Sequence, residues 1–272
     1  MARGRELTGL KIAITGGARG IGQATAARLS AGGAEVVIGD LDESLAHSVA
    51  DGLGITALPL DVTDAASWQA FVEQAGTLDV LVNNAGIMPL GSILKEPDQV
   101  TRAIVGVNLY GVVLGTKAAA PGMVERGSGQ LVNVASAVGR VAVAGGATYS
   151  ASKFAVVGFT EATRAELAPH GVEVGMVLPS VVRTELAAGL ADPRGVAPVT
   201  PEDVAAVIEQ MIRRPRAEMW VPRWAQGLAK GTSVLPRRLQ ERVAHAFKAD
   251  AILSDVDEAA RAAYEARVRP PS

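Results

Sequence analysis

A tyrosine and a lysine four positions apart, Tyr149 and Lys153, stand out in the small, apolar stretch "GGATYSASKFAVVGF". Residues at this spacing on a helix lie over one another, so the phenol and the ammonium can share a pocket. A free tyrosine has a pKa of about 10, too high for a proton shuttle at neutral pH. A unit charge about 4 Å away contributes about 4 kcal/mol at an effective dielectric of about 20, which lowers that pKa by about three units. The pair is therefore predicted to work as an acid or base near neutrality.

A glycine-rich loop, "TGGARGIG", follows the first apolar run and spaces Gly16, Gly20 and Gly22 as G-x-x-x-G-x-G. Such glycines allow a tight turn close to a pyrophosphate, and the helix that begins near Gly20 offers it free N–H groups and its dipole. Asp40 ends the next apolar run, where a carboxylate binds ribose hydroxyls and repels a 2′-phosphate. We therefore expect NAD as the cofactor rather than NADP, although Arg19 could pair with a phosphate.

The elements that position these residues alternate between strand-like and helix-like segments from residue 10 to residue 222. The strand-like runs are almost continuously apolar, which is typical of parallel strands covered by helices on both faces. This alternation predicts an α/β fold with a doubly wound, mainly parallel sheet of the Rossmann type. Helices are expected at residues 20–33, 43–53, 65–75, 97–116 and 149–169, and from a cap at Thr200 to about Arg213.

Composition excludes several classes of protein. The 272 residues contain no cysteine, which rules out disulfides, thiol catalysis and cysteine-based metal sites and fits a cytoplasmic protein. The net charge of −2 gives no indication of nucleic-acid binding. The three histidines are scattered, so no metal site is predicted. We expect no apolar run to approach the roughly 20 residues that are needed to span a bilayer.

Taken together, the ordered motifs resemble the short-chain dehydrogenase/reductase family, classical type. The resemblance rests on "TGGARGIG", Asp61-Val62, "NNAG", Asn108, Ser136 and "YSASK", in that order, and on "LPSVVRTEL", where Ser180 replaces the glycine of the family. It implies a catalytic set made of Asn108, Ser136, Tyr149 and Lys153. It also implies cofactor contacts from Tyr149, Lys153 and a further set of residues: Gly16, Arg19, Gly20, Ile21, Gly22, Asp40, Asp61, Val62, Asn83, Ala85, Pro179, Val182 and Thr184.

The resemblance also implies a role for each catalytic residue. Ser136 would donate a hydrogen bond to the substrate oxygen, and Lys153 would bind the nicotinamide ribose. Asn108 would anchor a water that links Lys153 to solvent. The expected reaction is hydride transfer between a nicotinamide cofactor and a secondary alcohol or ketone, in a homodimer or homotetramer. A dinucleotide-binding regulator without turnover is a second reading, although such a protein would not need the proton-transferring residues.

The chain is expected to divide into a Rossmann domain, residues 1–222, and a helical extension, residues 223–272. Within the first, residues 185–199 lie where the family places a substrate lid, and apolar Leu186, Leu190 and Val196 favour an apolar or lipid-like substrate. A capped helix is expected at residues 254–268, covering the active-site cleft or a partner.

The extension also carries an unusual positive charge. Residues 213–248 hold nine basic and two acidic side chains. Within this segment one apolar stripe is formed by Leu235, Leu239, Val243 and Phe247. Packing of the stripe on the enzyme or a neighbouring subunit is favoured. A third reading is a peripheral membrane protein that uses this basic amphipathic tail on an anionic surface.

Overall fold

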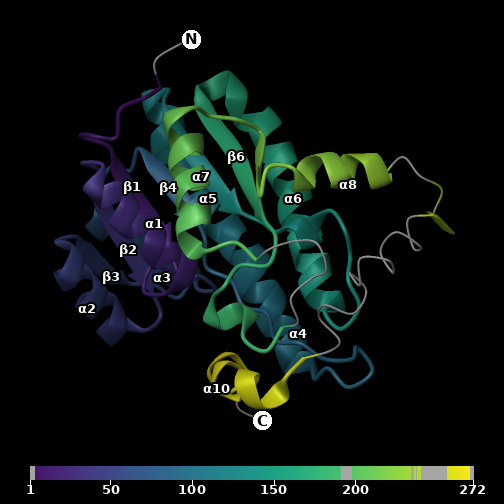
Figure 1. Cartoon of the computed structure of the whole chain (residues 1–272). Helices are drawn as coiled ribbons and strands as arrows, with labels where there is room; N and C mark the ends of the chain where they lie inside the picture. Colours follow the sequence, from purple (N-terminus) through teal and green to yellow (C-terminus); the bar gives the residue numbers. More distant parts are fainter. Residues whose placement is uncertain (1–3, 191–197, 234–235, 237, 240–255, 270–272) are drawn as a thin grey trace.

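Seven parallel strands form one sheet at the centre of the protein (Figure 1). The computed structural model describes residues 4–190, 198–233, 236, 238–239 and 256–269. The strand order is β3-β2-β1-β4-β5-β6-β7, and every adjacent pair is parallel, which confirms the predicted doubly wound sheet. The strands are β1 (Lys11–Thr15), β2 (Glu35–Asp40), β3 (Thr56–Pro59), β4 (Val80–Asn83), β5 (Gly129–Val134), β6 (Val172–Pro179) and β7 (Glu218–Val221).

Helices cover both faces of the sheet and bury a separate apolar cluster on each. On one face α1, α2 and α7 pack over β1, β2, β4 and β6. On the other face α3 and α5 pack over the same strands from the opposite side, and α6 lies beside them against β6. These helices are α1 (Gly20–Ala31), α2 (Glu43–Leu53), α3 (Ala65–Ala75), α5 (Gly111–Arg126), α6 (Ala147–Leu167) and α7 (Pro201–Arg213).

The helix ends follow from local capping chemistry. Asp42 and Asp64 accept hydrogen bonds from the first turns of α2 and α3, and both helices begin and end at the predicted residues. Thr200 and Asp203 form a capping box at the start of α7, with Pro201 at the first helical position. The predicted cap at Thr200 and the predicted end near residue 213 are therefore confirmed.

The helical segment at residues 98–126 is longer than predicted. It consists of α4 (Asp98–Val105), a π-helical turn, η1 (Gly106–Tyr110), and α5, which continues through Pro121 to Arg126 because Ala119, Ala120 and Met123 bury an apolar face. By length and composition this segment could span a membrane, which corrects the expectation that no run approaches that length. Half of its most apolar stretch is buried within the fold, as in a core helix.

The sheet places the functional segments at one edge. The chain leaves β1 and β4 toward opposite faces, so a crevice forms beyond the carboxyl ends of these neighbouring strands. The glycine loop follows β1, "NNAG" begins at the end of β4, and Ser136 and Ser180 follow β5 and β6. All of these segments therefore meet at the crevice.

The C-terminal extension contributes two described helices, α8 (Ala225–Ser233) and α10 (Glu258–Val268). Asp257 caps α10, which begins later than the predicted residue 254. Figure 1 shows α10 below α4, at the end of the molecule where the segment after β6 also lies. Of the predicted apolar stripe, Leu239 is exposed, and its other three residues lie outside the described part of the chain.

Candidate active site

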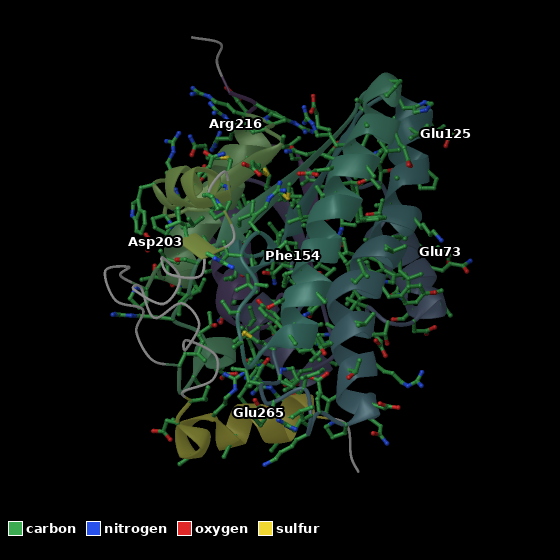
Figure 2. All side chains as sticks on the ribbon, turned by 90° about the vertical axis from the view of Figure 1, so that its right-hand side faces the viewer. Glu73, Glu125, Phe154, Asp203, Arg216 and Glu265 are labelled. Atoms are coloured by element: carbon green, nitrogen blue, oxygen red, sulfur yellow. The ribbon has the colours of Figure 1, made fainter. Side chains whose placement is uncertain are left out.

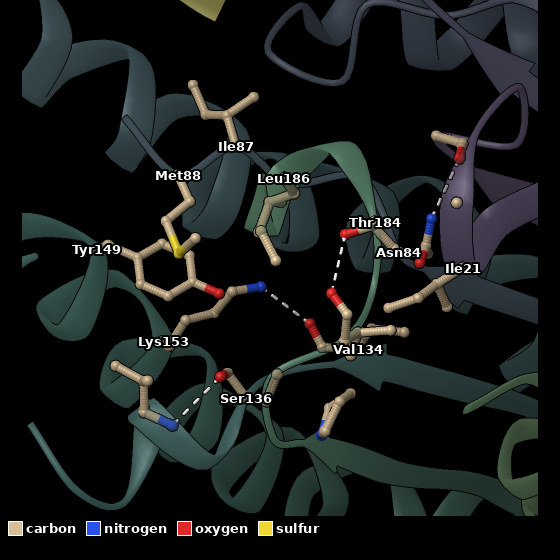
Figure 3. A pocket seen from close by; sticks show the side chains of 18 of the residues that line it. Ile21, Asn84, Ile87, Met88, Val134, Ser136, Tyr149, Lys153, Thr184 and Leu186 are labelled. Carbon is tan, nitrogen blue, oxygen red and sulfur yellow. Dashed lines mark hydrogen bonds between the residues drawn. The ribbon is translucent and has the colours of Figure 1, made fainter. Parts of the chain in front are cut away.

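One continuous cavity of about 1110 Å³ runs from the glycine loop to Tyr149. Figure 3 shows Ser136, Tyr149 and Lys153 around the same space, with Met88 and Leu186 above them. Most of the predicted site residues line this cavity: Gly16, Arg19, Gly20, Ile21, Asp40, Asp61, Val62, Ala85, Ser136, Tyr149, Lys153, Pro179, Val182 and Thr184.

The glycine loop has a geometry that other residues could not adopt. Gly16 and Gly20 have φ angles of +63° and +51°, in the left-handed region that favours glycine. A Cβ atom at Gly22 would lie 2.0 Å from the carbonyl oxygen of Gly16. The first turn of α1 opens into the cavity without a side-chain cap and without an acidic residue. These features fit the diphosphate of a dinucleotide, which the N-terminus of α1 would bind.

Asp40 and Asp42 organise the adenosine end of the cavity. Asp40 Oδ2 accepts a hydrogen bond from the Ala18 amide at 2.9 Å, so its carboxylate is fixed against the glycine loop. Arg19 Nη2 lies 2.8 Å from Asp42 Oδ2, and Arg19 Nη1 lies 3.6 Å from Glu185 Oε1. The Leu45 amide and the Arg19 guanidinium hold the pKa of Asp42 below its usual range. Arg19 is thus engaged by two carboxylates.

Three of the residues predicted to be catalytic lie just after β5 and on α6: Ser136, Tyr149 and Lys153. Lys153 Nζ donates to the Val134 carbonyl at 3.1 Å and lies 5.9 Å from the centroid of the Tyr149 ring. Ser136 Oγ accepts from the Val138 amide at 3.2 Å. The tyrosine and lysine side chains are both buried, at 6% and 5% exposure. The helical spacing therefore does bring the phenol and the ammonium into one pocket, as predicted.

The direction of the tyrosine pKa shift differs from the prediction. Burial raises the pKa of Tyr149 to about 12, against the lowering effects of a hydrogen bond with Ser136 and the positive charge of Arg261. Burial also lowers the pKa of Lys153 to about 8. The sequence argument placed a full charge against the hydroxyl, whereas the ammonium lies beside the ring and is bound to a carbonyl. Desolvation of the phenolate therefore dominates.

This site geometry agrees with comparisons to known proteins. A family model for short chain dehydrogenases matches residues 11–195. The chain belongs to the short-chain dehydrogenase/reductase family. It is an oxidoreductase acting on alcohols and ketones with a nicotinamide cofactor.

Two curated relatives and one solved structure illustrate the similarity. The 2,5-dichloro-2,5-cyclohexadiene-1,4-diol dehydrogenase LinX of Sphingobium indicum is 40% identical over 194 residues, 68% of this chain and 78% of the relative. The 3-alpha-(or 20-beta)-hydroxysteroid dehydrogenase of Mycobacterium tuberculosis is 39% identical over 187 residues, 66% and 72% of the two chains. A solved short chain dehydrogenase/reductase family protein is 31% identical with a TM-score of 0.75 over 79% of this chain and 97% of its own.

Three predicted site residues of this short-chain dehydrogenase do not line the cavity. Gly22 packs behind the glycine loop. Asn83 is buried in the sheet, where its amide donates to Asn133 Oδ1 at 2.9 Å. The residue that lines the cavity is its neighbour Asn84, whose amide donates to the Thr15 carbonyl at 2.9 Å. Adjacent side chains on a strand turn to opposite faces, so only the second asparagine of "NNAG" faces the cavity, and the cofactor contact expected of Asn83 stays a prediction.

Asn108 takes a supporting position in the dehydrogenase. It lies in the π-helical turn, where its side chain accepts from the Ile87 amide at 2.8 Å and donates to the Ile87 carbonyl at 2.9 Å. Its amide also donates to Ser152 Oγ at 3.1 Å. Asn108 thus fixes the segment that carries Met88 into the cavity. The water-anchoring role that the resemblance implies stays a prediction.

The substrate end of the dehydrogenase is lined by Leu186 and Leu190, as expected, whereas Val196 lies outside the described residues. It also includes residues that sequence reasoning did not select. Met88 and Tyr149 form a buried apolar cluster against Val138, Leu186 and Leu190. Tyr264, Arg267 and Val268 of α10 line the same cavity. The sequence "EAARAAYEARV" could have indicated the α10 residues, because large side chains recur in it among alanines at helical spacing. The same pattern distinguished Tyr149 and Lys153.

Proposed function

We propose that this short-chain dehydrogenase uses NAD to oxidise neutral, apolar ring alcohols to ketones, and to reduce the ketones in the reverse direction. The observation that carries the proposal is the single cavity that joins Asp40 at one end to Ser136, Tyr149 and an apolar cluster at the other. Each part of the proposal, cofactor, proton transfer and substrate, is supported by separate contacts.

The preference for NAD is supported by the charges around the adenosine end. Asp40 presents a fixed carboxylate at the end of β2, where it can accept hydrogen bonds from ribose hydroxyls. Arg19 is the nearby cation that a 2′-phosphate would require. Because Asp42 and Glu185 already engage Arg19, a phosphate at this position would have to compete with two carboxylates.

Proton transfer is assigned to Tyr149. When bound, the nicotinamide ring accepts a hydride from the alcohol carbon or returns it to the ketone carbon, and its oxidised form is positively charged. Ser136 would donate a hydrogen bond to the substrate oxygen and hold it near the phenol, a role supported by its position beside Tyr149. Because burial keeps Tyr149 protonated in the free protein, the residue is prepared to donate a proton to a ketone oxygen. Alcohol oxidation requires the phenolate, which neighbouring positive charge stabilises.

The substrate class is inferred from the lining of the far end. Met88, Leu186 and Leu190 provide an apolar surface close to the phenol. The guanidinium groups of the lining are already paired. Arg140 binds Glu161 and Glu218, and Arg267 binds Glu185 at 2.6 Å. The Lys153 ammonium donates to the Val134 carbonyl and lies beside the Tyr149 ring. A neutral ring alcohol would therefore lose little solvation on binding, whereas a carboxylate would find no unpaired guanidinium among the described lining residues.

An oligomer is supported by apolar side chains on the outer helices. Val105, Tyr110 and Phe154, from α4, the following π-helical turn and α6, are exposed. A homodimer or homotetramer that pairs these helices would bury them, and light scattering of the purified protein measures the mass. The membrane-surface alternative depends on the basic tail, of which residues 240–255 lie outside the described part of the chain.

A panel of alcohols tests the proposal. The purified protein is incubated with NAD or NADP and with cyclohexanol, a neutral hydroxysteroid, a hydroxycyclohexane carboxylate or a sugar alcohol, and cofactor reduction is followed by absorbance. The proposal predicts reduction of NAD with at least one of the two neutral ring alcohols and much slower reactions with the carboxylate and the sugar alcohol. Faster reduction of NADP, or a preference for charged or sugar substrates, would contradict it.

A further inference from the structure

The helix α10 lies across the substrate end of the cavity and contacts both of its rims. One rim is the segment after β4, which includes Met88 and Leu90. The other is the segment after β6, residues 185–190. Figure 2 shows α10, marked by Glu265, at this end of the molecule. The match to the family model ends at residue 195. The solved relative aligns over 97% of its own length with 79% of this chain. About a fifth of this chain therefore has no counterpart in that relative.

Arg261 connects the two rims through one buried guanidinium. Its Nη1 donates to the carbonyls of Leu186 at 2.8 Å and Ala188 at 3.0 Å, and its Nη2 donates to the Met88 carbonyl. Its Nε lies 2.6 Å from Glu265 Oε1. The side chain is only 2% exposed, so these contacts are shielded from water. Charge-assisted hydrogen bonds in such surroundings are strong and directional.

Tyr264 occupies the space between Arg261 and the cavity. Its hydroxyl accepts a hydrogen bond from the Met88 amide at 2.7 Å, and its ring lies 4.7 Å from the Arg261 guanidinium carbon. The residue is 6% exposed and lines the cavity, whereas Arg261 does not. Tyr264 thus presents an aromatic surface to a bound molecule, and Arg261 holds that surface in place.

Additional contacts fix the helix along its length. Arg267 binds Glu185 at 2.6 Å, and Arg269 donates to the Leu90 carbonyl at 2.9 Å. At the start of α10 the Asp257 amide donates to the Gly189 carbonyl at 2.9 Å. The helix α10 is therefore attached at both of its ends and at both rims of the cavity. These contacts fix its position beside the Tyr149 phenol.

We propose that α10 is the outer wall of the substrate pocket, in which Tyr264 is a specificity-determining residue that limits the size of the ring alcohol and Arg261 is the positioning residue that closes the pocket. The inference rests on the proposed function. It makes compact single-ring alcohols the preferred substrates and fused-ring alcohols poor ones, because the Tyr264 ring occupies space that a larger molecule would need.

The test compares cyclohexanol with a neutral hydroxysteroid. Tyr264→Ala should raise kcat/KM for the steroid relative to cyclohexanol by about tenfold or more, as expected when pocket volume decides selection. Tyr264→Phe keeps the ring and should preserve the wild-type ratio. Ala262→Ser, at an exposed position of α10, is the matched control for the helix. An unchanged ratio in Tyr264→Ala would overturn the assignment of Tyr264.

A second comparison tests the role of Arg261. Arg261→Met leaves three rim carbonyls without their donor. It should raise KM for both alcohols by about tenfold with a smaller change in kcat, because the pocket is no longer held in its binding form. Arg261→Lys keeps a charged donor and should recover part of the loss. A fall in kcat alone, with no recovery by lysine, would overturn the positioning role.

Two further readouts separate this inference from the proposed function. Amide exchange at Met88 should be about tenfold faster in Tyr264→Phe than in the wild type, because one hydrogen bond is lost. Equal exchange would overturn the docking of α10. If the wild type oxidises neither alcohol, the proposed function fails, and the wall is then tested by calorimetric binding of the two alcohols to the NAD-saturated protein. Tighter steroid binding by Tyr264→Ala would support the wall, and equal affinities would overturn it.

Discussion

The two ends of the cavity are built in different ways. At the cofactor end, a glycine loop and the residues at the ends of β1, β2 and β4 supply a surface within the first 86 residues, and the segment after β6 adds Thr184 and Glu185 against the loop. At the substrate end, Met88, Tyr149, Leu186 and Tyr264 come from four segments spread over 177 positions of the chain, from 88 to 264. Local backbone geometry thus forms the glycine-loop side of the first end. The second exists only after distant segments, including α10, have packed together.

Tyr149→Phe is predicted to have the largest effect, because Tyr149 stands where the two ends meet. Removing the hydroxyl should lower kcat by about 10²–10⁴-fold, the usual contribution of an acid–base group. Affinity for NAD should change little, since the ring and Lys153 remain. Steady-state kinetics and calorimetry measure the two quantities. Tyr110→Phe, at an exposed tyrosine, is the control. Turnover similar to that of the wild type would contradict the assignment.

Lys153→Met tests how much the burial of a charged amine, at the point where the two ends of the cavity meet, lowers the stability of the protein. The pKa of Lys153 is about 8 in the folded protein and 10.5 as the ordinary value. Between these values the unfolded chain binds a proton that the folded protein does not, so the free energy of unfolding rises with pH by roughly 3 kcal/mol across the window. Tyr149 has the opposite effect on the free energy of unfolding, but only above a pH of about 10. There the phenol ionises in the unfolded chain while burial keeps it protonated in the folded protein.

The measurement is urea unfolding at a series of pH values between about 8 and 10. Stability of the wild type should increase over this range, and that of Lys153→Met should change much less. Parallel pH dependence of the two proteins would show that the buried amine does not titrate as described.

Gly22→Ala tests whether the cofactor end depends on backbone packing. The added Cβ would meet the Gly16 carbonyl oxygen at 2.0 Å, so the loop must move. We expect a loss of about 1–3 kcal/mol in stability, typical of overpacking, together with weaker NAD binding. Gly52→Ala is the matched control, because its Cβ meets nothing within 4 Å in α2. That substitution should be neutral or slightly stabilising. Equal behaviour of the two variants would contradict the prediction.

Asp40→Ser is predicted to have the smallest effect, confined to the choice of cofactor. Removing the carboxylate should shift the ratio of kcat/KM between NAD and NADP toward NADP by about tenfold, since one charged hydrogen-bond acceptor is worth 1.5–3 kcal/mol. The relative rates with cyclohexanol and the steroid should not change. Asp51→Ser, at an exposed carboxylate of α2, is the control. An unchanged cofactor ratio would exclude Asp40 as the determinant.

The same contrast explains how much the sequence could predict. The sheet, the bounds of α2 and α3, the cap at Thr200 and the glycine loop depend on local patterns, and they were predicted closely. The partners of Asn83 and Asn84 depend on which face of β4 each side chain takes at the strand end.

Two other features depended on tertiary packing. The direction of the Tyr149 pKa shift depends on burial by segments that residue spacing does not reveal. The terminal helix was expected to cover a cleft or a partner, but its contacts through Arg261 and Tyr264 could be identified only in the folded structure.

The pH dependence of alcohol oxidation tests the central claim, proton transfer by Tyr149, most directly. Oxidation of cyclohexanol at saturating NAD requires the phenolate, so kcat/KM of the wild type should fall as the pH is lowered, approaching about tenfold per pH unit. The residual activity of Tyr149→Phe should show no such dependence. If the two proteins gave the same pH profile, Tyr149 would not be the group that takes the proton, and the account would be wrong.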